Sequence, residues 1–571
     1  MNEVTRVAAG TRVPQPDTRE LNFYKADASL RALLSLYMAK DEFAHIEPQL
    51  DRLGAMVGAE LDDLAHDADK NPPVLKARDR QGNNSQSVKK HPAYVRLEQL
   101  AFGDFALASM SHRPAMGWHE PLSSASKYAL TYLFTQSEFG LLCPVNMTDS
   151  LTRTIRRFAS KELLDRFLPG LTDEDGLKHT QGAMFMTERF AGSDVGATET
   201  RAVPDGDRWR LYGDKWFCSN ADAGLALVLA RPEGSGDGTR GLGLFLMPRE
   251  KQDGSPNEYR IVRLKEKLGT RSMASGEITL EGAEAWLVGD LSQGFRQMAE
   301  MVNQSRLSNA VRSAGMMRRA LHESLAVACG REAFGKRLLD LPLVRRQLIK
   351  MAMPAEQALS MVMFTAECLD KADKGDEGAQ LMRRVLTPLV KFRACRDARK
   401  VTGDAMEMRG GCGYIEEWVE QRLVRESHLG SIWEGTSNII ALDVIRASKK
   451  VEAHKALGEC LEQTIKGLSG DIASELSDRL KAAVALVDKV ANADGALDTH
   501  VRMAASGLYN VTSAVLLADE ARRLGDPYRE RIAKMVLRHR LNGSDPLVLP
   551  GEDESAETGI IESLVAARAK G

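Results

Sequence analysis

The spacing of apolar residues changes twice along the chain, and no other feature limits the fold as strongly. In the N-terminal part, apolar residues such as Leu30, Leu33 and Leu34 recur at intervals of three and four, which is the pattern of amphipathic helices. Over 181–290 the apolar segments are short and alternating, and turn residues separate them. Long helical patterns return at Gly294. The sequence therefore predicts an α+β protein in which one β domain interrupts helical domains.

The length of 571 residues allows several domains, and the pattern divides the chain into four. We expect an N-terminal helical domain that begins with an extended arm, a small antiparallel β-barrel or sandwich, a second helical domain and an additional helical domain, over residues 1–180, 181–290, 291–450 and 451–571. The polar stretch from Asn71 to Pro92 contains proline and glycine, and it indicates an irregular surface loop.

Composition excludes several classes of function. The formal net charge is -2, so the chain as a whole has no charge excess that would draw it to nucleic acid or acidic membranes. The seven cysteines include no C-x-x-C pair and the histidines no metal-ligand spacing, which predicts reduced thiols and no metal. We find no secretory signal and no apolar run long enough for a membrane span. These features predict a cytoplasmic protein.

The most informative stretch is 431–439, which reads Ser-Ile-Trp-Glu-Gly-Thr-Ser-Asn-Ile. Gly435 allows a sharp turn, and Thr436 or Ser437 can cap a following helix. Glu434 then lies in a turn among apolar neighbours, where partial burial can tune its pKa for work as a general base. The alternative is a carboxylate that only complements the helix dipole, and the local sequence by itself favours that alternative.

Two predicted strands end in side chains that suit a planar ligand. The first strand is followed by Thr187 and a small-residue loop with Ser193, whose hydroxyls could hydrogen-bond a ligand. The second strand carries Phe217 and Ser219 two positions apart, hence on one face. An aromatic wall beside a hydroxyl suits an isoalloxazine ring. Ordinary turn residues and half-buried strand residues are the alternatives.

Two glycine-marked turns in the helical region could meet phosphate groups. Arg331 closes a long predicted helix shortly before Phe334, and its guanidinium could bind a phosphate through two hydrogen bonds. Gly410 and Gly411 lie between two predicted helices and permit close approach of a pyrophosphate to the backbone. The alternatives are a helix-end charge with a glycine cap and an ordinary turn, since no Rossmann unit surrounds these glycines.

The order and spacing of these motifs resemble the acyl-CoA dehydrogenase family over about residues 90–450. The matching stretches are MTE with GSD, GDKWFCSN, GTR, RxAFGK, GGCGY and WEGTSNI. A closer likeness to the larger adaptive-response subgroup, the alkylation-inducible homologues, comes from LCPVNMT at 142–148, LKEKLGTRSMAS at 264–275 and the extra C-terminal block. Together these features cover most of the chain.

The resemblance implies FAD, bound non-covalently between a β-barrel domain and a domain built as a four-helix bundle. Thr187 and Ser219 would hydrogen-bond the flavin, Phe217 would pack against it, and Ser193 would contact FAD and substrate. The resemblance gives the other FAD contacts to Arg331, Phe334, Gly410 and Gly411 of a neighbouring subunit, and to Thr436 and Asn438.

By the same resemblance the reaction is α,β-dehydrogenation of an acyl-CoA thioester to the 2-enoyl-CoA. Glu434 is the base, hydride passes to flavin N5, and Arg306 and Gly435 meet the substrate. We expect a homodimer or homotetramer that delivers electrons to an electron-transferring flavoprotein. Two alternatives stay open: a DNA-associated flavoprotein of the response to alkylation damage with weak dehydrogenase activity, and an acyl-CoA oxidase.

The C-terminal block bears on the DNA alternative, because in the adaptive-response subgroup a similar block is linked to DNA binding. The block contains a basic segment whose members are Arg522, Arg523, Arg529, Arg531, Lys534, Arg538 and Arg540. A solvated helix face or a subunit contact is the favoured interpretation, since the chain has almost no net charge.

Overall fold

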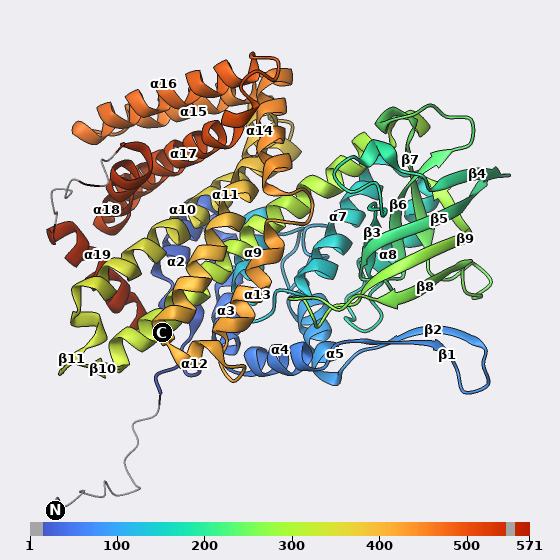
Figure 1. Ribbon diagram of the computed structural model, residues 1–571, viewed down its shortest axis with the longest axis horizontal. Coiled ribbons are helices and arrows are strands. Elements are labelled where there is room, and N and C mark those ends of the chain that lie inside the picture. Colours follow the sequence, from blue (N-terminus) through green and yellow to red (C-terminus); the bar gives the residue numbers. More distant parts are fainter. Residues whose placement is uncertain (1–14, 544–546, 548–553) are drawn as a thin grey trace, which may run out of the picture.

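The computed structural model describes residues 15–543, 547 and 554–571. Figure 1 shows a helical body on one side, a β domain on the other, and the C-terminal helices stacked along the outer edge of the helical body. Most of the predicted N-terminal arm, residues 1–14, lies outside the described residues. Among the helices that are described, none is long and apolar enough to cross a membrane. The predicted succession of helical, β and helical regions is confirmed.

The N-terminal helices bury the apolar stripes that the sequence shows. Leu30, Leu33 and Leu34 are fully buried. Asp27 starts their helix, because its carboxylate accepts a hydrogen bond of 2.9 Å from the Leu30 N–H. The helices of this region are α1 Phe23–Ala26, α2 Ala28–Tyr37, α3 Lys40–Val57, α4 Glu60–Lys70, α5 Pro92–Glu98, α6 Ser124–Phe134, α7 Leu142–Phe158 and α8 Lys161–Leu171.

The expectation of an irregular loop between Asn71 and Pro92 is wrong. This stretch forms an antiparallel hairpin of β1 (Val74–Arg78) and β2 (Asn84–Lys89), which extends beneath the β domain in Figure 1. The hairpin is attached through Gln86, whose side-chain oxygen accepts a 2.6 Å hydrogen bond from the Ile261 N–H. Mostly polar side chains hid the strand pattern, because exposed hairpin strands bury few apolar residues.

The β domain is a seven-stranded sheet in which five strands close into a barrel with a hydrophobic interior. β6 pairs with β4 on one side and β7 on the other, and β5 and β9 complete the ring, while β3 adds to β6 and β8 to β9. The pairings of β3 and β4 with β6 are parallel, so the barrel is not purely antiparallel as expected. The strands are β3 Gly182–Phe185, β4 Arg201–Asp205, β5 Arg208–Ser219, β6 Leu225–Pro232, β7 Gly243–Pro248, β8 Tyr259–Leu264 and β9 Ser275–Leu287.

Long helices form the rest of the molecule and share one hydrophobic core with the N-terminal helices. α9 Gly294–Gly330 packs against both α10 Pro342–Asp373 and α11 Glu377–Arg409. Two short strands, β10 Glu332–Ala333 and β11 Lys336–Arg337, follow α9. The remaining helices are α12 Gly411–Tyr414, α13 Glu420–Gly430, α14 Ser437–Val451, α15 Ala453–Lys466, α16 Asp471–Ala491, α17 Val501–Leu524, α18 Pro527–Val536 and α19 Glu554–Arg568.

Ion pairs within the chain neutralise most of the C-terminal basic segment. Arg529 is fully buried and pairs with Glu520 at 2.6 Å and with Glu356 at 3.2 Å. Other members pair with nearby acidic residues, Arg522 and Arg523 with Asp519, Lys534 with Glu530 and Arg540 with Asp397. Arg529 and Arg540 therefore connect the end of the chain to neighbouring helices, whereas the other pairs lie within α17 or within α18.

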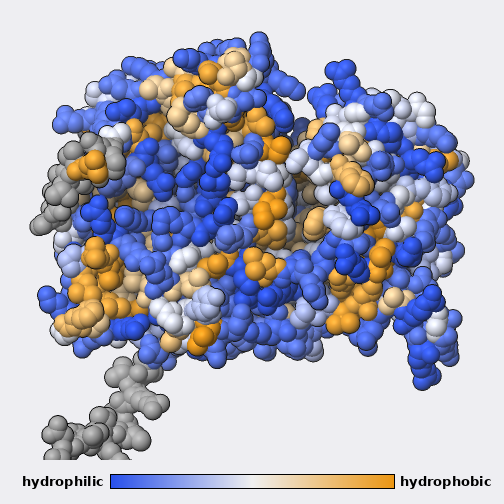
Figure 2. Space-filling view, viewed as in Figure 1, coloured by the Kyte–Doolittle hydropathy of each residue, from blue (hydrophilic) through white to orange (hydrophobic). Residues whose placement is uncertain are grey.

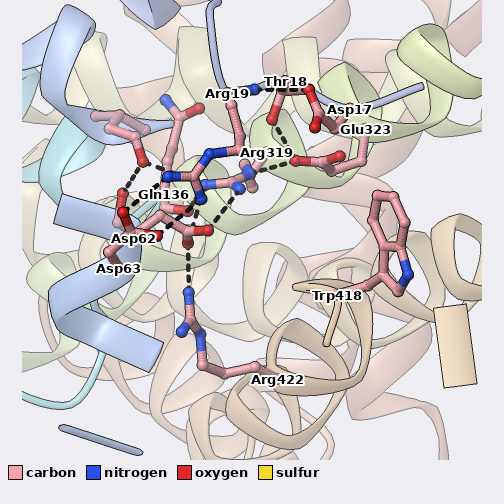
Figure 3. A network of polar contacts seen from close by, with 12 residues as sticks. Asp17, Thr18, Arg19, Asp62, Asp63, Gln136, Arg319, Glu323, Trp418 and Arg422 are labelled. Carbon is pink, nitrogen blue, oxygen red and sulfur yellow. Dashed lines mark hydrogen bonds and ion pairs between the residues drawn. The ribbon is translucent and has the colours of Figure 1, made fainter. Parts of the chain in front are cut away.

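A buried network of charges fixes α9 against α4 and α13 (Figure 3). Arg319 on α9 pairs with Glu323 at 2.7 Å and with Asp62 of α4 at 3.4 Å. Arg422 of α13 contacts the same Asp62 at 2.5 Å. The Thr18 hydroxyl donates to Glu323 at 2.6 Å and so ties the N-terminal segment to the network. Because these charges are paired and hydrogen-bonded, the network fixes the relative position of α9 and α13. The loop that follows α13 is therefore attached to a fixed helix.

Candidate active site

The loop between α13 and α14 carries Glu434 in an unusual backbone conformation. Glu434 has φ of +56° and Gly435 of +106°, and both values lie in the left-handed region. Glycine adopts that region freely, whereas a residue with a side chain does so at a cost. A Cβ on Gly435 would also lie 2.9 Å from the Ile440 side chain. The loop thus requires its glycine, and surrounding contacts must hold Glu434 in place.

Two side chains of α9 hold the Glu434 carboxylate. Ser305 Oγ donates to one carboxylate oxygen and Asn309 Nδ2 to the other. Ser305 in turn accepts from Asn146 Nδ2 of α7 at 2.8 Å. The spacing of four residues places Ser305 and Asn309 on one face of α9. The half-buried carboxylate is therefore oriented by hydrogen bonds from two neighbouring helical turns.

Arg306, which the resemblance assigns to substrate binding, also lies at this loop. Its Nε donates to the Glu434 carbonyl at 3.1 Å, and its Nη1 pairs with Asp443 of α14 at 2.7 Å. Arg306 therefore fastens the loop to the first turns of α14. Its predicted contact with substrate stays a prediction.

An aromatic pair and a buried cation lie behind the carboxylate. The rings of Phe139 and Trp433 stack with centroids 5.8 Å apart. The Arg312 guanidinium lies 4.8 Å from the first ring and 4.9 Å from the second. Its Nη2 donates to Asn309 Oδ1 at 3.1 Å, so the cation supports the residue that holds Glu434.

The predicted β-domain residues lie at two neighbouring strand ends. The Trp216 N–H donates to the Thr187 carbonyl at 2.9 Å, which brings Thr187 beside the end of β5. Phe217 on that strand is 57% exposed, although it is a large apolar side chain. Ser219 is half-buried on the same strand, and Ser193 lies exposed in the loop that follows Thr187.

The buried thiol of Cys143 links Ser219 to the Glu434 region. Burial raises the pKa of Cys143 to about 11, and the charge of Glu434 adds to the increase. A hydrogen bond from Ser219 opposes the increase in that pKa. Ser219 and Glu434 therefore both lie near Cys143 of α7.

The other predicted cofactor residues divide into two places. Thr436 and Asn438 are exposed at the start of α14, next to Glu434. Arg331 lies beside the Gly410 turn, because its Nη1 donates to the Arg409 carbonyl at 3.2 Å. Two further residues accompany it there, Gly411, which has open space around its Cα, and Phe334, which is 93% exposed. Figure 1 shows this second place, at β10, β11 and α12, at the opposite end of the molecule from the β domain.

The sequence did not identify several residues of this site. Ser305, Asn309, Arg312 and Asn146 show no motif beyond polar residues on helices that are otherwise buried. A polar pair at a spacing of four on α9 was the available signal. That signal identifies a face of the helix and says nothing about which loop packs on it.

Comparison with known proteins decides the family. Three family models match consecutive parts of the chain: the N-terminal domain of the adaptive response protein AidB over 14–175, the acyl-CoA dehydrogenase middle domain over 183–283 and the acyl-CoA dehydrogenase C-terminal domain over 292–449. The AidB protein of Escherichia coli K12 is 35% identical over 433 residues, which cover 73% of this chain and 77% of AidB. The chain belongs to the acyl-CoA dehydrogenase family.

A second family relative matches nearly the whole length. Acyl-CoA dehydrogenase family member 11 of Caenorhabditis elegans is 29% identical over 523 residues, 88% of this chain and 84% of the relative. The crystal structure of Caenorhabditis elegans ACDH-11 in complex with C11-CoA aligns with a TM-score of 0.87 and 28% identity, over 94% of each chain. The acyl-CoA dehydrogenase fold and the adaptive-response likeness predicted from the sequence are confirmed.

Proposed function

We propose that this protein is an FAD-dependent acyl-CoA dehydrogenase that uses Glu434 as the base. One observation carries the proposal: Ser305 and Asn309 orient the carboxylate of Glu434 in a turn whose backbone is left-handed. Family membership supplies the reaction class, and the relative solved with C11-CoA supports an acyl-CoA substrate.

The residues fit FAD. On one side, Phe217 exposes its ring at the end of β5, where a flat ligand would cover it, and two hydroxyls, those of Thr187 and Ser219, lie nearby. On the other, Arg331 and the open backbone at Gly411 offer a guanidinium and close approach to a phosphate. When bound by both groups of residues, FAD would supply the acceptor for the hydride that leaves the β-carbon of the substrate.

The two groups of FAD-binding residues lie at opposite ends of one chain, which supports a site shared between two subunits (Figure 1). Figure 2 shows apolar side chains gathered at the end that carries β10 and β11, where Phe334 and Leu343 are exposed. Exposed apolar residues of this kind mark protein contacts. We propose that a second copy covers this end and that the enzyme is a homodimer or a homotetramer.

The chain's own residues prepare the proton transfer. Ser305 and Asn309 hold the carboxylate of Glu434, so that it meets the substrate in one orientation. A C–H bond next to a thioester becomes acidic enough for a carboxylate only when the developing oxyanion is stabilised. The Glu434 N–H suits that task, since within the described residues it donates to no protein acceptor. Ser193, Arg306 and Gly435 are the proposed contacts of the acyl-CoA.

Electron-transferring flavoprotein is the proposed electron acceptor and the cytoplasm the proposed compartment. All seven cysteines are free, as in a reducing compartment. The DNA alternative is not favoured, because ion pairs within the chain occupy most of the basic segment. Rapid reoxidation of the reduced enzyme in air would instead favour the oxidase alternative.

Anaerobic titration of the yellow protein with a series of acyl-CoAs tests the proposal. Bleaching of the flavin absorbance near about 450 nm by one chain-length class would establish dehydrogenation and identify the substrate class. Glu434→Gln should retain FAD and bind acyl-CoA, yet lose nearly all bleaching. A bound flavin that no acyl-CoA reduces would refute the proposal.

A further inference from the structure

Lys391 is a buried lysine whose ammonium group, within the described residues, donates its hydrogen bonds to the Glu434 loop. It lies in the middle of α11 and is 1% exposed. Its Nζ donates to the Trp433 carbonyl at 2.8 Å and to the Gly435 carbonyl at 2.6 Å. These carbonyls precede and follow Glu434, so one ammonium group binds the backbone on both sides of the proposed base. Within the described part of the chain, no carboxylate lies within ion-pair distance of Lys391.

The first of these contacts acts on the peptide group that also contains the Glu434 N–H. The carbonyl of Trp433 and the N–H of Glu434 belong to one planar trans unit and point in opposite directions. A cation at the carbonyl oxygen therefore aims the N–H away from α11. It also polarises the unit, which makes the N–H a stronger donor.

Burial of this ammonium group lowers the stability of the fold, because the charge loses its hydration. Burial lowers the pKa of Lys391 to about 8, while Cys395 and Glu434 oppose that decrease and Arg306 adds to it. An apolar side chain of similar length, such as methionine, would fill the same space without the desolvation cost. Packing alone therefore gives no reason for a lysine here, whereas a role in the Glu434 loop does.

We propose that Lys391 is a positioning residue of the dehydrogenation. Through the Trp433–Glu434 peptide it aims and polarises the N–H that receives the thioester oxygen, and through the Gly435 carbonyl it holds Glu434 in its left-handed conformation. Lys391 acts through the backbone and touches neither substrate nor FAD. This inference rests on the proposed function, since it assumes that the Glu434 N–H meets a thioester.

The test compares Lys391→Met with Lys400→Met, a matched change at an exposed position of the same helix. FAD content, acyl-CoA binding and the single-turnover rate of anaerobic flavin reduction are measured for each, with the acyl-CoA that reduces the wild-type protein fastest. Substrate deuterated at the α-carbon and substrate deuterated at the β-carbon are run in parallel.

For Lys391→Met we expect flavin reduction to slow by about 10- to 100-fold, with FAD content retained. The α-deuterium isotope effect should increase, because removal of the α-proton becomes more difficult, and acyl-CoA binding should change by less than about threefold. Lys391→Arg keeps a charged donor and should recover part of the rate. Lys400→Met should behave as the wild type.

Reduction of Lys391→Met at the wild-type rate would overturn the inference, and so would a loss of rate only in proportion to lost FAD. If Lys391→Met does not fold, Lys391→Gln provides the measurement, since it keeps an N–H donor without the charge; the same two results would then overturn the inference. Failure of every acyl-CoA to reduce the wild-type flavin would refute the proposed function itself, before any variant is compared.

Discussion

The side chain of Asn309 joins the carboxylate of Glu434 to the indole of Trp433. Its Nδ2 donates to the carboxylate, and its Oδ1 accepts from Trp433 Nε1 at 2.6 Å. One amide on α9 therefore sets the relative orientation of two consecutive loop residues that point in different directions. Replacing Asn309 would remove this orientation, although Glu434 and Trp433 would both remain in the site.

Asn309→Ala should slow flavin reduction while FAD stays bound. The change leaves the carboxylate of Glu434 without one donor and the indole N–H of Trp433 without its acceptor. Loss of a hydrogen bond to a charged group costs about 1.5–3 kcal/mol, so we expect a decrease of about 10- to 100-fold in the single-turnover rate. Asn492→Ala, the same change at an exposed helix end, is the control. An unchanged rate in Asn309→Ala would mean that the carboxylate is oriented by other contacts.

Gly435→Ala should lower the rate of flavin reduction more strongly than it lowers the stability of the fold. The φ of +106° and the 2.9 Å approach to Ile440 both oppose a side chain at this position. A cost of about 1–3 kcal/mol would displace the loop and with it Glu434. Gly507→Ala lies inside α17 with open space around it and should be neutral or slightly stabilising. Thermal unfolding and flavin reduction, measured on both variants, separate the two outcomes.

The contrast between these glycines illustrates what the sequence could predict. The motif around Glu434 predicts the turn, the helix after it and the need for Gly435, because all three are local properties. Long amphipathic patterns over 294–329, 341–373 and 379–408 likewise predict α9, α10 and α11 to within about two residues at each end. Ser305 and Lys391 could not be assigned, since their roles depend on which loop packs against α9 and α11, and packing partners distant in sequence leave no local signal. The hairpin β1–β2 was missed because its side chains are mostly polar.

Stability should fall as pH rises from about 4.5 to about 8, and Glu426 is one cause. Burial raises the pKa of this carboxyl to about 8, and nearby Glu138 adds to the increase. The group is therefore protonated in the folded protein and ionised in the unfolded chain between its usual pKa and about 8. Its contribution to stability is complete below its unfolded pKa and is lost as pH rises through the folded one, at no more than about 1.4 kcal/mol per pH unit.

Glu426→Gln tests this assignment. Glutamine keeps an acceptor for the Thr270 N–H, which donates to Glu426 at 2.8 Å, and it cannot ionise. Relative to the wild type, the variant should gain resistance to denaturant as pH rises from about 4.5 to about 8, and the difference should stay constant above that pH. A difference that does not change between these pH values would show that other groups govern the loss of stability.

The rate of flavin reduction should also fall above about pH 8, through Lys391. Burial lowers the pKa of Lys391 to about 8, so the ammonium is present below that pH and is lost above it. The titratable groups that face it are Cys395 on the same helix, Glu434 on the loop and Arg306 on α9. Arginine stays protonated throughout this range. The alkaline decrease should therefore disappear in Lys391→Arg, and its persistence there would assign it to another group.

Mixed subunits test whether the site is shared. Arg331→Ala should lose FAD and Glu434→Gln should lose turnover, so each variant alone is inactive. If Arg331 serves the FAD of its neighbour, a mixed dimer contains one site with both native residues, and random mixing should restore about one quarter of the wild-type activity. If both residues serve the same subunit, every site in the mixture lacks one of them and no activity returns. Co-expression with two different affinity tags isolates the mixed dimer, in which about half of the sites should be active, and a single rate measurement on that species distinguishes the two arrangements.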